Sequence, residues 1–491
     1  MMYSFFLQTL LVHLTCSEII SDPQKHRVVI IGAGVSGFSA AATLLENDVS
    51  DIVVLEASSR IGGRIHTVEL GGITVDLGAE TINGNVDNAV YELANPQELL
   101  ASFKPFTHPD MNIYANTSGH IFNTAEINSL ANKLYAMFKA EELKNCNGSL
   151  SDYFYPRLDE FFRSNNVDTA IGEALRYHIE QLKGVYYAVD TLDQLGASGT
   201  TRYRMNEPVS LKWKVGGYKT IFDLISKRFL SPDEIPVQSK ILLNKQVTRI
   251  EQQGSEVRVE TADGSIYLAD HVIVTLPLGV LKDEAAQIFH PPLPERKAAA
   301  IKALGFGGVV KVFMLFPERW WPTDKNIITP LFSQKELEDF KANSVHGHWS
   351  ASTAVFKPVI SSNRMLCAWI SGPSALHVET LSNDEIEEGL MELLNRLLGR
   401  TLKVMKPERI LRSDWCNNPF FKGTYSYLSA VSDRQNITND DLRQPILDAN
   451  DKPVVLFAGE ATHPCYQSTV HGAIETGRRE ANTIIDYLNK L

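Results

Sequence analysis

Short apolar runs, each followed by a glycine or an acid, mark both ends of this chain. Residues 28–31 and 52–55 are unbroken runs of valine, isoleucine and leucine, with a glycine-rich stretch and a helical pattern between them. Near the other end, residues 454–457 form a third run, and residues 470–488 carry a helical pattern. Short continuous apolar runs are typical of strands buried on both faces. The pattern predicts an α/β protein.

The middle of the chain carries weaker signals. Residues 246–251, 256–261 and 271–275 are predicted strands, with a turn at the Ala-Asp-Gly of residues 262–264. Residues 126–144 have helical periodicity and are predicted as a helix with a solvated charged face.

A glycine fingerprint joins the first strand to the first helix. Gly32, Gly34 and Gly37 follow the first strand in a G-x-G-x-x-G arrangement, and Glu56 ends the second strand. In such turns the first glycine permits the tight turn, the second lets a pyrophosphate approach the backbone, and the third lets the helix pack closely. The helix N-terminus binds the pyrophosphate, and the acid accepts hydrogen bonds from the adenosine ribose. The segment predicts a dinucleotide site.

Two further segments extend this site. Residues 60–64, Arg-Ile-Gly-Gly-Arg, offer backbone amides and a guanidinium to a second stretch of phosphate. Gly459 and Glu460 follow the strand at 454–457 and precede the last helix. A glycine fingerprint at one end with strand–Gly–Glu–helix at the other is typical of proteins that bind an extended FAD.

The ordered motifs resemble those of the flavin-containing amine oxidase family, and within it the polyamine oxidases of the animal spermine and acetylpolyamine type. They run over nearly the whole chain in family order. The matching stretches are residues 29–34, 55–57, 60–64, 76–79, 274–281, 421–427, 457–464 and 469–473.

The resemblance implies a fold and a cofactor. The expected fold is α/β, with a Rossmann-like FAD-binding domain interleaved with an α+β substrate-binding domain, as in amine oxidases and p-hydroxybenzoate hydroxylase. The FAD-binding domain would comprise residues 24–90, 235–290 and 405–491, and the substrate-binding domain residues 91–234 and 291–404. Relatives with covalent flavin carry a cysteine where this chain has Thr424, so non-covalent FAD is expected. The implied cofactor-binding residues are Gly32, Gly34, Gly37, Glu56, Arg64, Gly78, Ala79, Val247 and Glu460.

The resemblance also implies a reaction. FAD would oxidise spermine, spermidine or acetylated polyamines with dioxygen, giving an aldehyde, a shorter amine and hydrogen peroxide. Tyr425 would form an aromatic wall beside the flavin, and Thr469 would face it and bond a substrate nitrogen. Lys311 would lie beneath the flavin and hold a water against N5. A lysine in the apolar strand at 309–315 is costly without a partner or a task, and its alternative is an edge position with the ammonium in solvent.

The substrate side departs from the family pattern. Relatives carry Trp where this chain has Thr81, and His or Glu where it has Asn83. Asn83 can accept a hydrogen bond from an ammonium but carries no charge. Glu80 is expected either to compensate or to be a buried structural acid, and Glu180 either to bind substrate or to be a solvated helix residue. Two alternatives stay open: a secreted L-amino-acid oxidase, and a flavin- or polyamine-binding homologue without catalysis.

The composition limits the number of domains and the kinds of partner that the chain can have. The 491 residues are 44% hydrophobic, enough for two domains. The net charge of −11 speaks against nucleic acid as a partner and suits a cationic substrate. No zinc-like cysteine spacing and no membrane anchor are apparent, and a monomer or weak oligomer is expected. One or two disulfides can form among Cys146, Cys367, Cys416 and Cys465.

The two ends of the chain carry possible targeting signals for different compartments. Residues 5–14 are apolar but too short to span a bilayer, and small residues follow at 15–17, which predicts a signal peptide at 1–17 and secretion. Acceptor sequons at Asn116, Asn147 and Asn436 fit a secreted glycoprotein. The final Asn-Lys-Leu of residues 489–491 is near the peroxisomal Ser-Lys-Leu ending, so a peroxisome is the alternative.

Overall fold

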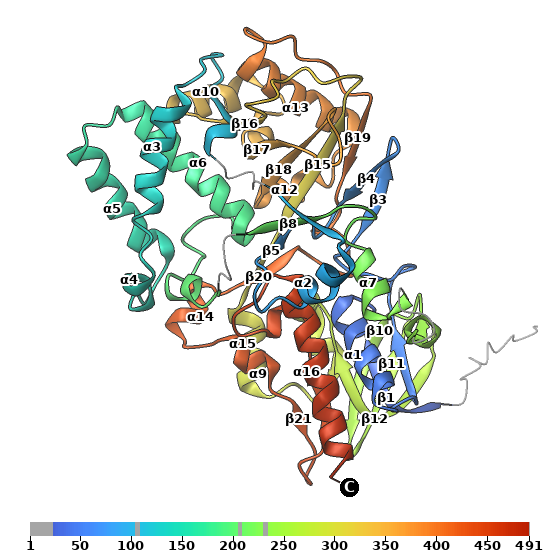
Figure 1. Cartoon of the computed structure of the whole chain (residues 1–491). Helices are drawn as coiled ribbons and strands as arrows, with labels where there is room; N and C mark the ends of the chain where they lie inside the picture. The colour runs from blue at the N-terminus through green and yellow to red at the C-terminus, as the bar shows by residue number, and fades with distance from the viewer. Residues whose placement is uncertain (1–22, 104–108, 205–208, 229–233, 491) are drawn as a thin grey trace, which may run out of the picture.

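Two large sheets, each built from separate segments of the chain, organise the protein (Figure 1). The computed structural model describes residues 23–103, 109–204, 209–228 and 234–490. The predicted leader at 1–17 therefore lies outside the described residues. In Figure 1 the sheet that contains the glycine turn lies in the lower part, and the second sheet lies above it.

The larger sheet has nine strands within the described ranges. β1 (Gln24–Ile31) is flanked by the parallel strands β2 (Ile52–Leu55) and β12 (Ile266–Val274). The other edge of β12 pairs with β11 (Glu256–Thr261) in its first half and with the parallel β22 (Pro453–Phe457) in its second half. The carboxyl ends of four parallel strands thus meet at one edge, where ligands bind in open α/β sheets. The other strands of this sheet are β9 (Ile241–Leu242), β10 (Val247–Gln253), β13 (Phe289–His290) and β21 (Ile446–Leu447).

The second sheet has six strands in the order β19-β15-β18-β17-β16-β7. β15 (Val309–Leu315) is buried along its whole length between β18 (Met365–Ser371) and β19 (Arg409–Arg412). The remaining three strands are β7 (Asn112–Ala115), β16 (Ile327–Pro330) and β17 (Thr353–Pro358). Smaller pairings use β3 (Thr67–Leu70), β4 (Ile73–Asp76), β5 (Ile82–Asn83), β6 (Leu100–Ser102), β8 (Ser210–Trp213), β14 (Gly305–Gly307) and β20 (Tyr425–Tyr427).

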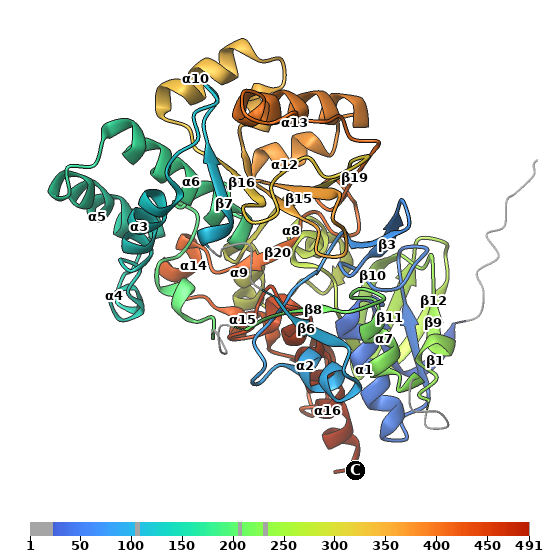
Figure 2. The same cartoon turned by 45° about the horizontal axis from the view of Figure 1, so that its top comes forward.

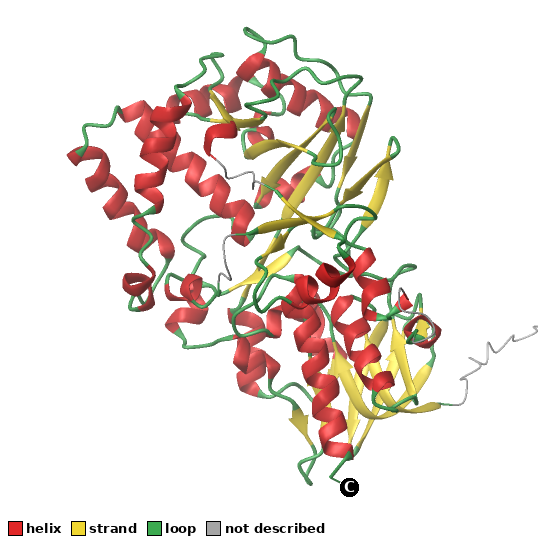
Figure 3. Cartoon of the chain, in the orientation of Figure 1, coloured by secondary structure: helices red, strands yellow, loops and turns green. Residues whose placement is uncertain are grey.

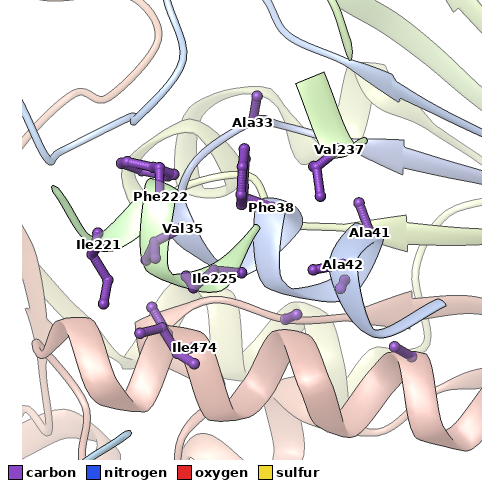
Figure 4. Packing of buried hydrophobic residues seen from close by; sticks show 14 of the residues in the cluster. Ala33, Val35, Phe38, Ala41, Ala42, Ile221, Phe222, Ile225, Val237 and Ile474 are labelled. Carbon is purple, nitrogen blue, oxygen red and sulfur yellow. The ribbon is translucent and has the colours of Figure 1, made fainter. Parts of the chain in front are cut away.

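Two long helices cover one face of the nine-stranded sheet. α1 (Val35–Glu46) packs against α16 (Val470–Leu488), and a Cβ on Gly477 would lie 2.1 Å from the carbonyl oxygen of Ser36, so only glycine permits this approach. Figure 4 shows Phe38 of α1 facing side chains of α7 (Thr220–Ile225), with Ile474 of α16 below. The helix that begins at the glycine turn is therefore fixed by a core cluster that includes the last helix.

Helices α3 to α6 form a separate group beside the six-stranded sheet (Figure 3), and both viewing directions place them together (Figure 2). This group comprises α3 (Thr124–Tyr135), α4 (Ala140–Lys144), α5 (Leu150–Ser164) and α6 (Thr169–Tyr187). The remaining helices are α2 (Ala89–Ala94), α8 (Leu278–Ile288), α9 (Glu295–Ala303), α10 (Gln334–Asn343), α11 (Gly347–Ser350), α12 (Pro373–Val378), α13 (Asn383–Leu398), α14 (Ala430–Arg434) and α15 (Asn439–Arg443). Short 3-10 turns are η1 (Asn95–Gln97), η2 (Pro109–Met111), η3 (Ser198–Thr201), η5 (Val237–Lys240) and η6 (Glu460–Thr462). None of the helices in the described part of the chain is long and apolar enough to cross a membrane.

The predicted strands and the last helix are confirmed, with ends shifted by a few residues. The single helix predicted at 126–144 is wrong, because α3 and α4 are separated by a turn at residues 136–139. The Phe138 ring in this turn stacks on Phe154 of α5 with ring centres 4.3 Å apart. That contact depends on tertiary packing, so helical periodicity could not predict the break.

The predicted domain boundaries differ from the sheets at two places. β19 pairs with β15 in the six-stranded sheet, although the predicted FAD-binding domain includes residues 405–491. α7 packs in the core of the nine-stranded sheet, although the predicted substrate-binding domain includes residues 91–234. For all other residues, we propose the two domains with the boundaries predicted from the sequence.

Candidate active site

A large cavity among the described residues connects the two sheets. Its volume is about 680 Å³, and it runs from the glycine turn after β1 to Lys311 on β15 and Trp369 on β18. Concave sites of a few hundred cubic ångströms are the usual size for cofactors and small ligands. The cavity opens at the carboxyl edge of the nine-stranded sheet, where the sequence predicts the dinucleotide.

The three fingerprint glycines have different environments. Gly32 has φ +103°, which favours glycine, and its N–H donates to the carbonyl of Leu55 at 2.8 Å. A Cβ on Gly37 would lie 2.0 Å from the carbonyl oxygen of Gly32, so Gly37 serves the packing of α1; it does not line the cavity. Gly34 does line it, has φ −67°, and a Cβ there would meet no atom within 4 Å. The space beside Gly34 fits a ligand that approaches the backbone.

Glu56 is held in place by backbone donors. Its carboxylate accepts the Ala33 N–H at 2.7 Å and the Ser58 N–H at 2.9 Å, and the residue is buried. Each carboxylate oxygen has two lone pairs, so Glu56 can also accept hydrogen bonds from ribose hydroxyls. Glu56 lines the cavity close to the glycine turn, as a ribose partner must.

Arg64 and Glu460 form one unit, although 396 residues separate them. Arg64 Nη1 donates to Glu460 Oε1 at 2.9 Å and to the carbonyl of Thr424 at 2.7 Å. Glu460 Oε2 accepts the Ser426 hydroxyl at 2.6 Å and the Ser468 N–H at 2.7 Å. Both residues line the cavity. This pair joins the loop of residues 60–64 to Thr424 and Ser426, which lie at the opposite wall of the cavity.

The other predicted cofactor residues also line the cavity. Gly78 lies so close to the Arg64 carbonyl that a Cβ would be 1.7 Å from it, and the Ala79 N–H donates to the same carbonyl at 3.3 Å. Val247 begins β10 and is buried at the cavity wall. By contrast, Arg60 donates to the carbonyls of its own loop, including that of Gly63 at 2.7 Å, and is not a lining residue.

A cluster of buried charges lies at the far end of the cavity. Lys311 Nζ donates to Glu80 Oε2 at 2.8 Å and to the Asp76 carbonyl at 2.6 Å, and Lys357 Nζ donates to Glu80 Oε1 at 2.6 Å. The two lysine side chains are only 5% and 7% exposed. Burial raises the pKa of Glu80, but the charges of Lys311 and Lys357 outweigh burial and hold that pKa at about 2. The edge-position alternative for Lys311 is wrong, because the lysine faces a carboxylate inside the protein.

Aromatic side chains wall the cavity beside this cluster. Tyr425 lies in β20, and its hydroxyl donates to the carbonyl of Val185 at the end of α6. Tyr187 and Tyr203 also line the cavity, and burial raises the pKa of each to about 12, so both hydroxyls are neutral at physiological pH. Tyr186 lines the cavity with 59% of its surface exposed.

Thr469 has a structural task that the sequence did not reveal. It is the N-cap of α16: its hydroxyl accepts the Gly472 N–H at 3.0 Å and donates to the Tyr466 carbonyl at 2.7 Å. The hydroxyl proton of Thr469 is therefore already engaged in the hydrogen bond to the Tyr466 carbonyl. One lone pair remains, so Thr469 can accept from an amine N–H but is not set to donate to a neutral amine nitrogen.

The remaining predicted substrate residues differ. Asn83 is exposed on β5 and lines the cavity. Glu180 does not line the cavity; it lies on α6, where its carboxylate accepts the Tyr155 hydroxyl at 2.5 Å. Glu180 is thus directed to α5 and not to a substrate. Glu80 lines the cavity, but both of its oxygens bond lysines, so it is not an open binding site for an ammonium.

Several site residues were missed from the sequence. Lys357 lies in an apolar strand just as Lys311 does, and that same signal could have found it. Tyr186, Tyr187 and Trp369 carried no local signal, because only the fold brings the end of α6 beside β18. His471 also lines the cavity, and burial lowers its pKa to about 4, so it is neutral at pH 7.

Two expectations about covalent modification are also corrected. The four cysteines in the described residues are free thiols, so none of the possible disulfides forms among them. Asn116 is buried, and its amide nitrogen donates to Glu336 at 2.5 Å, so this sequon is not accessible to a glycan. Asn147 and Asn436 are exposed.

Comparison with known proteins agrees with this geometry. A family model for flavin containing amine oxidoreductases matches residues 35–485. The probable polyamine oxidase 5 of Arabidopsis thaliana is 30% identical over 544 residues, covering 94% of this chain and 99% of the relative. The human peroxisomal N(1)-acetyl-spermine/spermidine oxidase is 30% identical over 509 residues, covering 94% and 95%. A solved structure of wild-type putrescine oxidase bound to putrescine has a TM-score of 0.68 at 19% identity, covering 94% of this chain and all of that one.

The fold and cavity define a two-domain flavin enzyme with a Rossmann-like domain and an α+β domain. The chain belongs to the flavin containing amine oxidoreductase family. It is an FAD-dependent oxidoreductase that acts on the CH–NH bond of amines with dioxygen as acceptor.

Proposed function

We propose that the protein is a polyamine oxidase with non-covalent FAD, and that acetylated polyamines are its preferred substrates among spermine, spermidine and their acetylated forms. The products would be an aldehyde, a shorter amine and hydrogen peroxide. The observation that carries the proposal is a buried lysine, Lys311, at the aromatic end of a cavity that continues into the cofactor site.

FAD, when bound, accepts a hydride from the carbon beside the amine nitrogen and passes electrons to dioxygen. Gly34 and the N-terminus of α1 would hold its phosphates, Glu56 would hold its ribose, and Arg64 and Glu460 would lie near its far end. No described cysteine lines the cavity, which supports non-covalent binding. Tyr425 positions the amine with its ring face, because its hydroxyl is already bonded to the Val185 carbonyl.

The substrate end favours an uncharged group on the amine. The described lining includes four acids: Glu56 and Glu460 belong to the cofactor end, Glu284 pairs with Lys422 at 2.7 Å, and Glu80 bonds two lysines. None is free to hold a distal ammonium. An acetamide carries no charge and can bond to Asn83, so acetylation removes one of the ammonium groups that would need a carboxylate. The reacting nitrogen is neutral in an apolar pocket, where the tyrosine rings pack against the alkyl chain beside it. This supports acetylated over free polyamines.

The two alternatives predict different sites. An L-amino-acid oxidase needs a cationic group for the substrate carboxylate, usually an arginine. Arg64 is the arginine among the described lining residues, and its guanidinium already bonds Glu460 and the Thr424 carbonyl. A homologue without catalysis would not need to retain a buried lysine at the reactive end.

A peroxide assay separates the three functions. Purified holoenzyme is mixed with N1-acetylspermine, spermine, spermidine, L-leucine and L-phenylalanine, and hydrogen peroxide is followed with a coupled peroxidase. The proposal expects turnover of N1-acetylspermine at a higher kcat/KM than spermine, and no turnover of amino acids. Turnover of amino acids alone supports the oxidase alternative, and loss of peroxide with every amine supports the non-catalytic one.

We further propose that the protein is located in the peroxisome. In solution we propose a monomer or a weak oligomer. The human relative is named as peroxisomal, which favours the peroxisome over the secretion predicted from residues 1–17. Peptide sequencing of the native N-terminus tests it: an intact Met1 supports a peroxisomal protein, and a chain that starts near Ser17 supports secretion.

A further inference from the structure

Three neighbouring strands place a second buried lysine beside Lys311. Trp369 of β18 lies directly opposite Lys311 of β15, and Val355 of β17 lies opposite Trp369 on the other side. Residues two apart on a strand share a face, so Lys357 joins the face of Val355 and Trp369. The Nζ atoms of Lys311 and Lys357 lie 5.0 and 4.4 Å from the centre of the Trp369 ring.

Glu80 links the two lysines across this ring. Its two oxygens bond one lysine each, at 2.8 Å for Lys311 and 2.6 Å for Lys357. Lys311, Lys357 and Glu80 together carry one positive charge on the cavity side, and the Asp76 carboxylate behind them offsets it when ionised. Asp76 lies behind the cluster: its carboxylate accepts the Thr67 hydroxyl at 2.5 Å and the Tyr218 N–H at 3.1 Å, and it does not line the cavity.

We propose that Lys357 is a positioning residue which, by neutralising Glu80, makes the reactive end of the cavity more positive by one charge. Lys311 and Glu80 by themselves form a neutral pair, and the field of such a pair falls off faster than that of a net charge. Lys357 compensates Glu80 and leaves the charge of Lys311 to act on the cavity. This inference rests on the proposed function, because it directs that charge at the flavin.

A positive charge at this position favours negative charge on the reduced cofactor and on dioxygen as it accepts electrons. Reoxidation moves two electrons and one proton from the anionic reduced flavin to dioxygen. A second proton from solvent completes hydrogen peroxide, and the flavin returns to its oxidised form. The charge therefore acts on both the reduction potential and the reoxidation rate.

Three variants separate charge from packing. Lys357→Met leaves the neutral Lys311–Glu80 pair. Glu80→Gln combined with Lys357→Met leaves Lys311 as the single charge, so the net charge returns to that of the native protein. Lys357→Arg keeps the native charge with a different shape. All measurements use pH 7.5, above the pKa of about 6 to which burial raises Asp76, so that Asp76 is ionised in every protein.

The reduction potential is measured against a reference dye with a chemical reductant and no amine, and the photoreduced flavin is then mixed with oxygenated buffer. We expect Lys357→Met to lower the two-electron equilibrium constant at least tenfold, which is a shift of about 30 mV to more negative potential. Reoxidation should slow at least tenfold as well. The double variant and Lys357→Arg should return both values to within about twofold of the native protein.

The melting temperature of the apoprotein tests the charge cluster without flavin. A fourth variant, Glu80→Gln alone, leaves two buried lysines without their carboxylate, so it should unfold at a lower temperature than the double variant. The inference is overturned if Lys357→Met has a native potential, or if the double variant has the same altered potential as Lys357→Met. Because no amine is present, either result leaves the test of the proposed substrate independent.

Discussion

Lys297 offers a quantitative test of how the FAD-binding half is stabilised. It lies on α9 with 3% of its surface exposed, and its Nζ donates to the Leu442 carbonyl at 2.5 Å and lies 3.9 Å from the centre of the Phe457 ring. Burial lowers the pKa of Lys297 to about 7, although the charge of Glu480 opposes this. We expect Lys297→Met to raise the stability of the protein near neutral pH.

The magnitude follows from linkage. A base whose pKa is lower in the folded than in the unfolded state lowers the free energy of unfolding most when both states are protonated. This cost is full below about pH 7 and disappears above the unfolded pKa of about 10.5. At about 1.4 kcal/mol per pKa unit, the cost is about 4–5 kcal/mol at pH 7. The methionine variant leaves the Leu442 carbonyl without its donor, which costs about 1–3 kcal/mol. The net gain is about 1–4 kcal/mol, or about 1–4 °C in Tm for a chain of 491 residues, because the unfolding entropy is about 2.1 cal/mol/K per residue.

The assay is thermal unfolding of both proteins between pH 6 and pH 9.5. The contribution of Lys297 should be constant below about pH 7, and native stability should rise with pH above it, because there the unfolded state binds a proton that the folded state does not. The advantage of the variant should therefore shrink above that pH and approach zero or reverse by pH 9.5. Glu480 keeps its ion pair with Arg479 at 2.5 Å in the variant, so removal of Lys297 leaves no isolated charge.

Lys302→Met is the matched control, because Lys302 is an exposed lysine on the same helix. It should change Tm little and by the same amount at every pH. A Lys297→Met advantage that is constant with pH, or a loss of stability at pH 6, would refute the reasoning and show that the hydrogen bond to Leu442 outweighs the burial of charge.

Three further outcomes are expected at the site. Gly34→Val should fold with a native circular dichroism spectrum but bind no FAD, since the added atoms enter the open space beside the helix N-terminus; a yellow variant with full flavin content would contradict this. Acid precipitation should release all of the flavin into the supernatant, because Thr424 and the described cavity lining offer no cysteine link; pigment that stays with the pellet would reject non-covalent binding. Lys311→Met should retain FAD but slow flavin reduction, reoxidation or both by more than tenfold, a barrier increase above about 1.4 kcal/mol. Stopped-flow traces at native speed for both half-reactions would make this lysine merely structural.

Elements with local sequence signals could be predicted before the fold was known. Apolar runs fixed the positions of β1, β2 and β22, because a strand buried on both faces must be apolar throughout. The glycine turn with Glu56 predicted the dinucleotide site, since backbone conformation and close approach require glycine at defined spacing. The apolar strand at 309–315 also marked Lys311 as a costly residue in need of a partner. The ordered motifs identified the family.

The hydrogen-bond partners of the polar side chains could not be predicted from local patterns. Glu80 lies 231 residues from Lys311 and 277 from Lys357, so no local pattern could show that its carboxylate is already taken by two lysines. The proton of Thr469 is used by a helix cap, and Glu180 turns to a tyrosine of α5. Hydrogen bonds and ion pairs depend on atoms within about 3 Å, and in a fold built from interleaved segments those atoms come from distant parts of the chain.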